Sequence, residues 1–349
     1  MSARQASSCT CNSGFTGLFQ SFSIERPQEI FGAVGMPLVQ VNAAGERPEP
    51  QGGAAGLGLL LDRALAGLPP RAPVAVLIHG LKFSPSVPEL SPHRHILALD
   101  PDERCWKAVS WPRALGFTGQ SRSEGLCIAF GWESGSNVWR AYDEAARAGV
   151  ALARLIEAIR LRAPDRRVDL LGHSLGARVA LAAMAALGTE AVGHAVLMAP
   201  AEFASQAQTA LRSTAGRQAR VLNVTSGEND LYDWLLERFV ARRGDGPTLG
   251  RGLGTAQVNW ADLRIDDAPT LATLAGLGHR VAPPDRRICH WSPYVRPGML
   301  ALYAALIRGD LPYELLRTRL PEAPAARWSR LLALPRVELP LPFAGNAPS

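Results

Sequence analysis

The stretch Val168-Asp-Leu-Leu-Gly-His-Ser-Leu-Gly176 decides how the rest of the chain is interpreted. Its first four residues are typical of a short buried strand, and the alanine-rich run after Gly176 predicts a helix. Ser174 stands on the turn between them, with glycine two residues before and two residues after it. A Cβ atom at either glycine would press into the neighbouring strand or helix. We therefore expect Ser174 to be presented at the C-terminal edge of a parallel sheet, beside the N–H of Leu175.

A glycine-flanked serine is a weak motif alone, and the alternative is a serine in an ordinary glycine turn. The strand and helix around it are what the motif requires as a nucleophile elbow. On these residues the sequence resembles the α/β-hydrolase superfamily. The resemblance implies an α/β fold, namely a mostly parallel central sheet with helices on both faces. It also implies that Ser174 is the nucleophile and that Leu175 donates one N–H to the oxyanion.

A second informative stretch is the apolar run Val74–Ile78, which predicts a strand covered on both faces and is followed by His79-Gly80. In the superfamily a His-Gly pair at this place opens the oxyanion loop. The resemblance therefore implies that Leu81 donates the second N–H. His79 either packs and hydrogen-bonds the loop or contacts the substrate, and we keep both interpretations.

The resemblance also implies where the triad acid and base lie. Strand 220–224 runs into Thr225-Ser-Gly-Glu-Asn-Asp230, and Asp230 takes the place of the acid, with Glu228 and Asp233 as alternatives. His290 precedes a helix that starts near Pro297, which is where the general base is expected, and its rival is His279. The chain order Ser174, Asp230, His290 matches the α/β-hydrolase order and differs from those of chymotrypsin and subtilisin.

A serine hydroxyl needs a base to accept its proton and an acid to hold that base in the right tautomer. The predicted function is therefore hydrolysis of a carboxylic ester through an acyl-enzyme on Ser174. The same triad would serve a thioesterase, a lipase, a peptidase or an acyltransferase. A binding module with the same fold and no catalysis is the alternative from another class.

The region between the first strand motif and the elbow predicts a buried strand at 126–130 and a long helix. That helix should begin near Ser136 or Asn137 and stop at Pro164, since its apolar residues recur at spacings of three and four. The pattern from Phe130 to Tyr142 is similar to a branch of little-characterised bacterial α/β-hydrolases. In that branch proline usually follows the tryptophan, whereas this chain has Glu133. Other expected elements are strands at 36–42, 195–198 and 258–265, and helices at 54–68, 104–115, 270–275 and 297–309.

We expect a single domain over residues 1–319, with its core at about 73–310, and a proline-rich tail at 320–349. Two insertions, 82–125 and 236–287, should attach at the sheet edge that carries Ser174 and cover the site. The candidates for the substrate pocket are four aromatic side chains, His79, His173, Trp106 and Trp111. An aromatic cover favours short to medium acyl groups. His93, His95 and nearby acids form a loop without a convincing metal geometry.

Composition narrows the remaining classes. The chain has 349 residues, a net charge of +6 and only two lysines, Lys82 and Lys107. Its arginines form no run with interleaved aromatics, so we expect no nucleic-acid partner. The five scattered cysteines favour a reducing compartment. The sequence has no signal-like start and no apolar run of about 18 to 20 residues, so a cytoplasmic protein without a membrane span is expected. We expect neither a metal nor a cofactor, and composition leaves the oligomeric state open.

Overall fold

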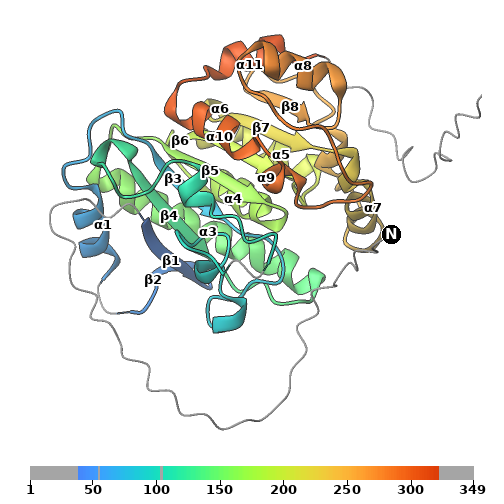
Figure 1. Ribbon diagram of the computed structural model, residues 1–349. Coiled ribbons are helices and arrows are strands. Elements are labelled where there is room, and N and C mark those ends of the chain that lie inside the picture. Colours follow the sequence, from blue (N-terminus) through green and yellow to red (C-terminus); the bar gives the residue numbers. More distant parts are fainter. Residues whose placement is uncertain (1–37, 54–55, 103–104, 322–349) are drawn as a thin grey trace, which may run out of the picture.

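The computed structural model describes residues 38–53, 56–102 and 105–321, and its centre is an eight-stranded sheet (Figure 1). The strand order is β2-β1-β4-β3-β5-β6-β7-β8. Neighbouring strands pair in parallel, except that β2 runs antiparallel to β1. The strands are β1 (Leu38–Ala44), β2 (Arg47–Pro50), β3 (Val74–Ile78), β4 (Leu126–Gly131), β5 (Val168–His173), β6 (Val192–Met198), β7 (Arg220–Thr225) and β8 (Trp260–Arg264). The predicted mostly parallel sheet is confirmed.

The inner strands are apolar along their whole length because helices cover both faces of the sheet. In β3 the side chains of Val74, Val76 and Ile78 join one hydrophobic core, and those of Ala75 and Leu77 join the other. This alternation follows from the period of two along a strand.

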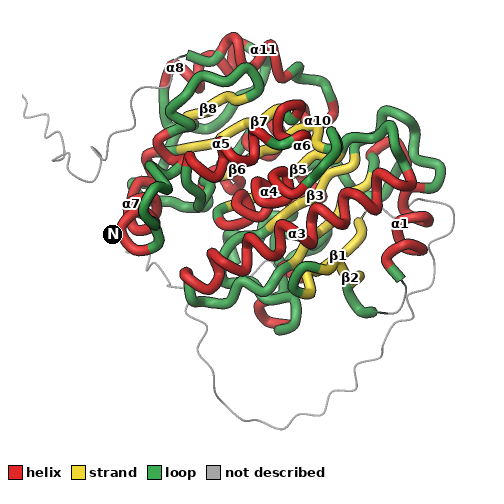
Figure 2. The backbone as a smooth tube through the Cα atoms, turned by 180° about the vertical axis from the view of Figure 1, so that it is seen from behind, coloured by secondary structure: helices red, strands yellow, loops and turns green. Residues whose placement is uncertain are grey.

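Helices on the first face pack on the larger core, and Figure 2 shows the long helix α3 crossing that face beside α4. They are α1 (Leu57–Leu65), α3 (Val138–Arg162), α4 (Leu175–Ala186), α5 (Ala204–Arg212) and α6 (Thr214–Gln218). The side chain of Asn137 caps α3 by accepting from the N–H of Arg140, and the helix ends at Arg162, two residues before Pro164. Both limits agree with the predicted helix.

The opposite face is covered by α2 (Trp111–Ala114), α8 (Ala268–Gly276), α9 (Ser292–Val295), α10 (Met299–Arg308) and α11 (Tyr313–Arg319). The helix α7 (Asp230–Phe239) follows β7. The described ranges also contain short 3-10 turns: η1 (Pro88–Leu90), η2 (Pro92–Arg94), η3 (Arg122–Glu124), η4 (Gly227–Asn229) and η5 (Leu249–Arg251). Helix α10 begins at Met299, two residues after the predicted start at Pro297, and it ends at Arg308, directly before the predicted stop at Gly309.

Two expected elements differ from the structure. The helix predicted at 104–115 is only the four-residue α2, because Pro112 suits the first turn of a helix and Gly116 has a φ of +82° just past its end. The segment 236–287 carries β8, which pairs with β7 and extends the sheet. Part of that segment is therefore core rather than cover. Residues 1–37, 54–55, 103–104 and 322–349 lie outside the described ranges, and so do the expectations that fall on them, such as the start of the first strand and the tail.

The edge strand β2 contains Pro48 and Pro50. The N–H of Gln51 donates to Gln40 O over 2.9 Å, so every second residue of this segment points its backbone N–H toward β1. The two prolines fall on the alternate positions, which face away from β1.

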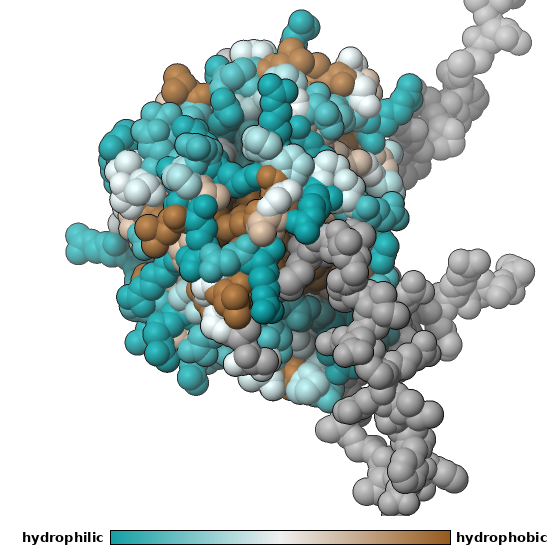
Figure 3. Space-filling model, turned by 90° about the vertical axis from the view of Figure 1, so that its left-hand side faces the viewer, coloured by the Kyte–Doolittle hydropathy of each residue, from teal (hydrophilic) through white to brown (hydrophobic). Residues whose placement is uncertain are grey.

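Figure 3 shows the side of the molecule on which α1 lies. Hydrophilic residues cover most of it, and hydrophobic residues gather in its middle. Within the described ranges, none of the helices combines the length and the apolar character that a membrane crossing needs.

Candidate active site

The turn after β5 holds Ser174 in an unusual backbone conformation. Its φ is +57° and its ψ is −123°, a region that residues with a side chain rarely adopt. The turn is closed so tightly that a Cβ at Gly172 would lie 2.5 Å from Gly176 O, and one at Gly176 would collide with Ile78 O. The backbone N–H of Ser174 donates to Met198 O on β6 over 2.9 Å. The serine is thereby fixed at the C-terminal edge of the sheet, at the start of α4.

The loop after β3 runs directly beside this turn. A Cβ at Gly80 would lie 2.8 Å from the Cβ of Ser174 and 2.9 Å from His173 O, so only glycine fits there. The next residue is Leu81, the predicted donor to the oxyanion. Among the described residues, neither the N–H of Leu81 nor that of Leu175 donates to a backbone carbonyl outside the regular elements. These two N–H groups are the candidates for binding a developing oxyanion.

His79 is fully buried and both of its ring nitrogens make hydrogen bonds. Nδ1 donates to Gly80 O over 2.8 Å, and Nε2 accepts from the N–H of Trp132 over 3.0 Å. The ring stacks on that tryptophan with centroids 5.5 Å apart. Burial lowers the pKa of His79 to about 3. The geometry favours the interpretation in which His79 holds the loop.

His290 contacts His173, the residue directly before Ser174. The rings of these two residues are 4.6 Å apart, and Nε2–H of His173 donates to His290 O over 2.9 Å. The loop that carries His290 is also tied to the turn after β7, because the N–H of Cys289 donates to Glu228 O over 2.9 Å. The rival His279 follows α8, where its N–H donates to Leu274 O.

The acceptor at Nδ1 of His290 is the amide oxygen of Asn229, at 2.5 Å. Asn229 immediately precedes Asp230, the residue predicted to be the acid, which is buried as the first residue of α7. Of the two alternatives, Glu228 forms a buried ion pair with Arg296 and Asp233 accepts from Nδ2 of Asn229 over 3.0 Å. The role of Asp230 stays a prediction. Sequence reasoning missed Asn229 because a carboxylate was expected, and the adjoining Asn229-Asp230 pair was the available signal.

The site favours an uncharged His290. Burial lowers the pKa of its imidazole well below 6.5, and the charge of Lys107, together with that of His173 when it is protonated, lowers the pKa further. Burial also lowers the pKa of His173 to about 4. Both imidazoles are therefore neutral near pH 7, and a neutral imidazole is the form that can accept a proton.

The predicted pocket residues lie at different depths. Trp111 is fully buried, with its ring 5.0 Å from Tyr294 and 6.4 Å from His173, so it packs beneath the site. Trp106 is 47 % exposed and its ring lies 5.9 Å from that of Trp291, the residue after His290. The structure thus brings one tryptophan of the 82–125 segment to the loop that carries His290. On the other side, the ring of Tyr232 stacks on His290 at 4.5 Å.

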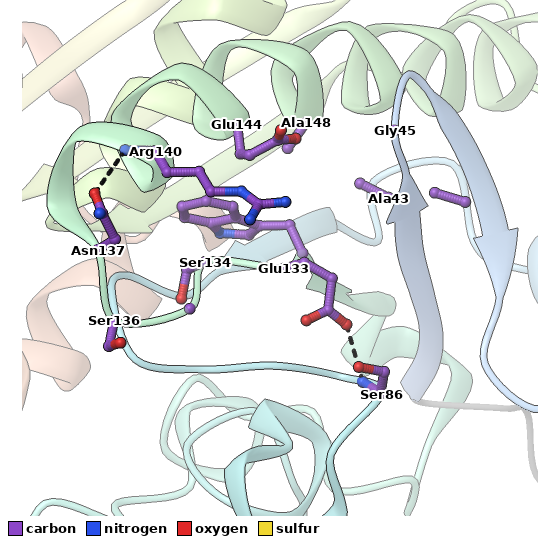
Figure 4. Close-up of a pocket in the computed structure, with 13 residues that line it drawn as sticks. Ala43, Gly45, Ser86, Glu133, Ser134, Ser136, Asn137, Arg140, Glu144 and Ala148 are labelled. Atoms are coloured by element: carbon purple, nitrogen blue, oxygen red, sulfur yellow. Dashed lines mark hydrogen bonds between the residues drawn. The ribbon is translucent and has the colours of Figure 1, made fainter.

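A cleft of about 650 Å³ opens near the ends of β1 and β4 and the beginning of α3 (Figure 4). Its lining includes Trp132, Glu133 and Arg140, and it does not include Ser174 or His290. Glu133 is held at the rim by the N–H of Ser86 over 3.0 Å. Trp132, which lines this cleft, also donates its backbone N–H to His79. The cleft therefore borders the loop after β4, and this loop is hydrogen-bonded to the loop after β3 that carries Gly80 and Leu81.

The described residues contain no group of three or more His, Cys, Asp or Glu side chains that could hold a metal ion. Nε2 of His93, one of the histidines in the 82–125 segment, is 2.7 Å from Oδ1 of Asn42. That imidazole therefore supports the end of β1.

The sequence pattern of the alpha/beta hydrolase family matches residues 75–346, which is most of the chain. The chain belongs to the alpha/beta hydrolase family. This membership agrees with the eight-stranded sheet and with the elbow between β5 and α4, and it supports a hydrolase in general. The comparison with curated proteins gives no match. Membership of the alpha/beta hydrolase family does not specify a substrate, so any proposal for the bond that is cleaved is argued from the residues of the site.

Proposed function

We propose that the protein is a serine hydrolase that cleaves carboxylic esters through an acyl-enzyme on Ser174. The observation that carries the proposal is the backbone of Ser174, whose φ of +57° is retained between two close-packed glycines. A conformation that costs about 1 to 3 kcal/mol persists where the surrounding structure enforces it, and such positions cluster at active sites.

In the proposed reaction, Oγ of Ser174 attacks the carbonyl carbon of the ester while Nε2 of His290 accepts its proton. The oxyanion that forms is bound by the N–H groups of Leu81 and Leu175. The carbon–oxygen bond of the ester then breaks, and His290 gives the proton to the departing alcohol. Water, deprotonated by the same imidazole, attacks the acyl-enzyme and releases the carboxylic acid and free Ser174. The low pKa of His290 keeps it in the base form at the start of the cycle.

The substrate that we propose is a small ester with a short to medium acyl group. Support comes from the aromatic rings of Tyr232 and Trp291 beside His290, and from Trp106, whose ring packs against that of Trp291. Apolar, aromatic walls exclude water and favour uncharged groups over charged ones. No nucleic acid, metal or cofactor takes part in this reaction scheme.

The test is labelling with a fluorophosphonate probe, followed by mass spectrometry of the modified peptide. We expect the wild-type protein to be labelled on Ser174 and to hydrolyse p-nitrophenyl esters, and Ser174→Ala to do neither. A protein that carries no label, or that is labelled elsewhere, would contradict the proposal. A folded, unlabelled wild type would instead favour a binding module.

A further inference from the structure

The amide of Asn229 has a fixed orientation. Its Nδ2 donates to Oδ2 of Asp233 over 3.0 Å, and its Oδ1 faces Nδ1 of His290. Asparagine and aspartate are both almost fully buried, at 3 % and 4 % exposure, and water therefore does not compete for these bonds. Asn229 ends η4 directly before α7, and Asp233 lies in the first turn of α7. Because the chain turns helically through both, the spacing of four residues brings the two side chains onto the same side.

The surroundings leave Asp233 and the turn of Asn229 little room to move. A Cβ at Gly250 would collide with the carboxyl group of Asp233, so the 3-10 turn η5 closes against it. The N–H of Asn229 donates to Ser226 O over 2.9 Å. The preceding residue, Glu228, is joined to the His290 loop through the N–H of Cys289 and through its ion pair with Arg296.

The plane of the His290 ring is set as well. Tyr232 stacks on it with an angle of 23° between the rings, and its Nδ1 lies 2.5 Å from the amide oxygen. An amide oxygen can only accept, so Nδ1 must carry the proton of the neutral imidazole. Nε2 then has a free lone pair, which is the tautomer that a general base needs.

We infer that Asn229, held by Asp233, is the positioning residue that orients His290 in place of a triad carboxylate. This inference rests on the proposed function, because His290 is the general base there. The neutral amide fixes the tautomer and ring direction, and it adds no negative charge beside the imidazolium that forms during the reaction. Asp233 does not contact His290 in this arrangement. It acts through Asn229, because its bond to Nδ2 opposes a flip of the Asn229 amide.

The test measures the tautomer and the turnover separately. In protein labelled with ¹⁵N-histidine, with the His290 signals assigned by their loss in His290→Ala, we expect His290 of the wild type to carry its proton on Nδ1. Asn229→Ala should lose this fixed tautomer and lower kcat about 100-fold or more with KM little changed, as expected for a base held in the wrong tautomer. Asn229→Asp keeps an acceptor at the same place and should recover most of the lost activity.

Two further variants distinguish a residue that orients His290 from one that only stabilises the fold. Asp233→Ala should lower kcat while the fold persists, because it removes the oxygen that accepts from Nδ2 of Asn229. Asn259→Ala is the matched control: this asparagine donates to Gly216 O and Ala219 O away from the site, so its loss should lower stability and leave kcat unchanged.

Either of two results would overturn the inference. One is a wild-type His290 with its proton on Nε2. The other is an Asn229→Ala enzyme with wild-type kcat while Asp230→Asn is inactive, which would make Asp230 the triad acid. An unlabelled Ser174 in the fluorophosphonate experiment would overturn the proposed function instead, and the tautomer measurement would still decide how His290 is held.

Discussion

The backbone N–H of Trp132 donates to Nε2 of His79 over 3.0 Å, and the indole N–H of the same tryptophan donates to His79 O, also over 3.0 Å. These two hydrogen bonds join the loop after β3 to the loop after β4. Since Gly80 and Leu81 follow His79 directly, the pair fixes the backbone that faces Ser174.

His79→Leu should destabilise the protein by about 1 to 3 kcal/mol, because it leaves the buried N–H of Trp132 without an acceptor. The free energy of unfolding, measured with urea, checks this value. His279→Leu is the control: that side chain is partly exposed, and its replacement should cost less than about 0.5 kcal/mol. Equal losses in both variants would argue against a special role for the bond to Trp132.

Stability should fall as the pH drops from about 6.5 toward 4. Burial lowers the pKa of His79 to about 3 and those of His93 and His173 to about 4, whereas in the unfolded chain each is near 6.5. Between these values the unfolded state binds protons that the native state does not bind. Each histidine therefore contributes a slope of up to about 1.4 kcal/mol per pH unit, with its stabilisation fully present above pH 6.5.

Urea unfolding at several pH values measures that slope. His173→Gln can still donate to His290 O but does not titrate, so it should make the dependence less steep. An unchanged slope in this variant would mean that His173 titrates alike in both states.

The conformation of Ser174 predicts a difference between two inactive variants. Ser174→Ala and Ser174→Gly should each lower ester hydrolysis by about 10⁴-fold or more, because both remove the nucleophile. Only glycine relieves the backbone at a φ of +57°, so Ser174→Gly should be about 1 kcal/mol more stable than Ser174→Ala. Thermal unfolding of the two variants side by side provides the comparison, and identical midpoints would contradict the strain at this position.

Gly80→Ala should impair both folding and activity. The added Cβ would lie 2.8 Å from the Cβ of Ser174, and neither the turn nor the loop can retreat without moving Leu81 and Leu175, the proposed oxyanion donors. The matched control is Gly188→Ala, where a Cβ would meet nothing within 4 Å. We expect the control to hydrolyse esters at the wild-type rate. Comparable activity of Gly80→Ala would show that the loop lies farther from the reacting group than its contacts indicate.

Trp106 should influence acyl-chain preference, because its ring contacts that of Trp291 beside His290. Trp106→Ala is expected to shift the ratio of kcat/KM between butyrate and octanoate esters while fluorophosphonate labelling of Ser174 persists. Trp234→Ala, at a tryptophan that is similarly exposed (45 %) on α7, serves as the control. The same ratio in all three proteins would remove Trp106 from the substrate pocket.

The elements that were predicted well are those with a strong local pattern. Strand β3 has its predicted limits because a run of five apolar residues ends at a His-Gly turn, and α3 has them because Asn137 and Pro164 mark its ends. The β8 strand was assigned to a covering insertion, since pairing with β7 is a long-range property. The contact between Asn229 and His290 joins residues that are 61 apart in the sequence, and no local pattern reveals it. Which of Glu228, Asn229 and Asp230 faces His290 depends on how the chain turns into α7.

Pro48 and Pro50 have a consequence for how these molecules meet in solution. At the free side of β2 both positions lack the N–H that an incoming strand would need as a donor. A second molecule therefore cannot continue the sheet there by backbone pairing, even when crowding brings two such edges together. Within the part of the chain that the structure describes, these two prolines close this border of the sheet to edge-to-edge pairing, and they lie far along the sheet from Ser174.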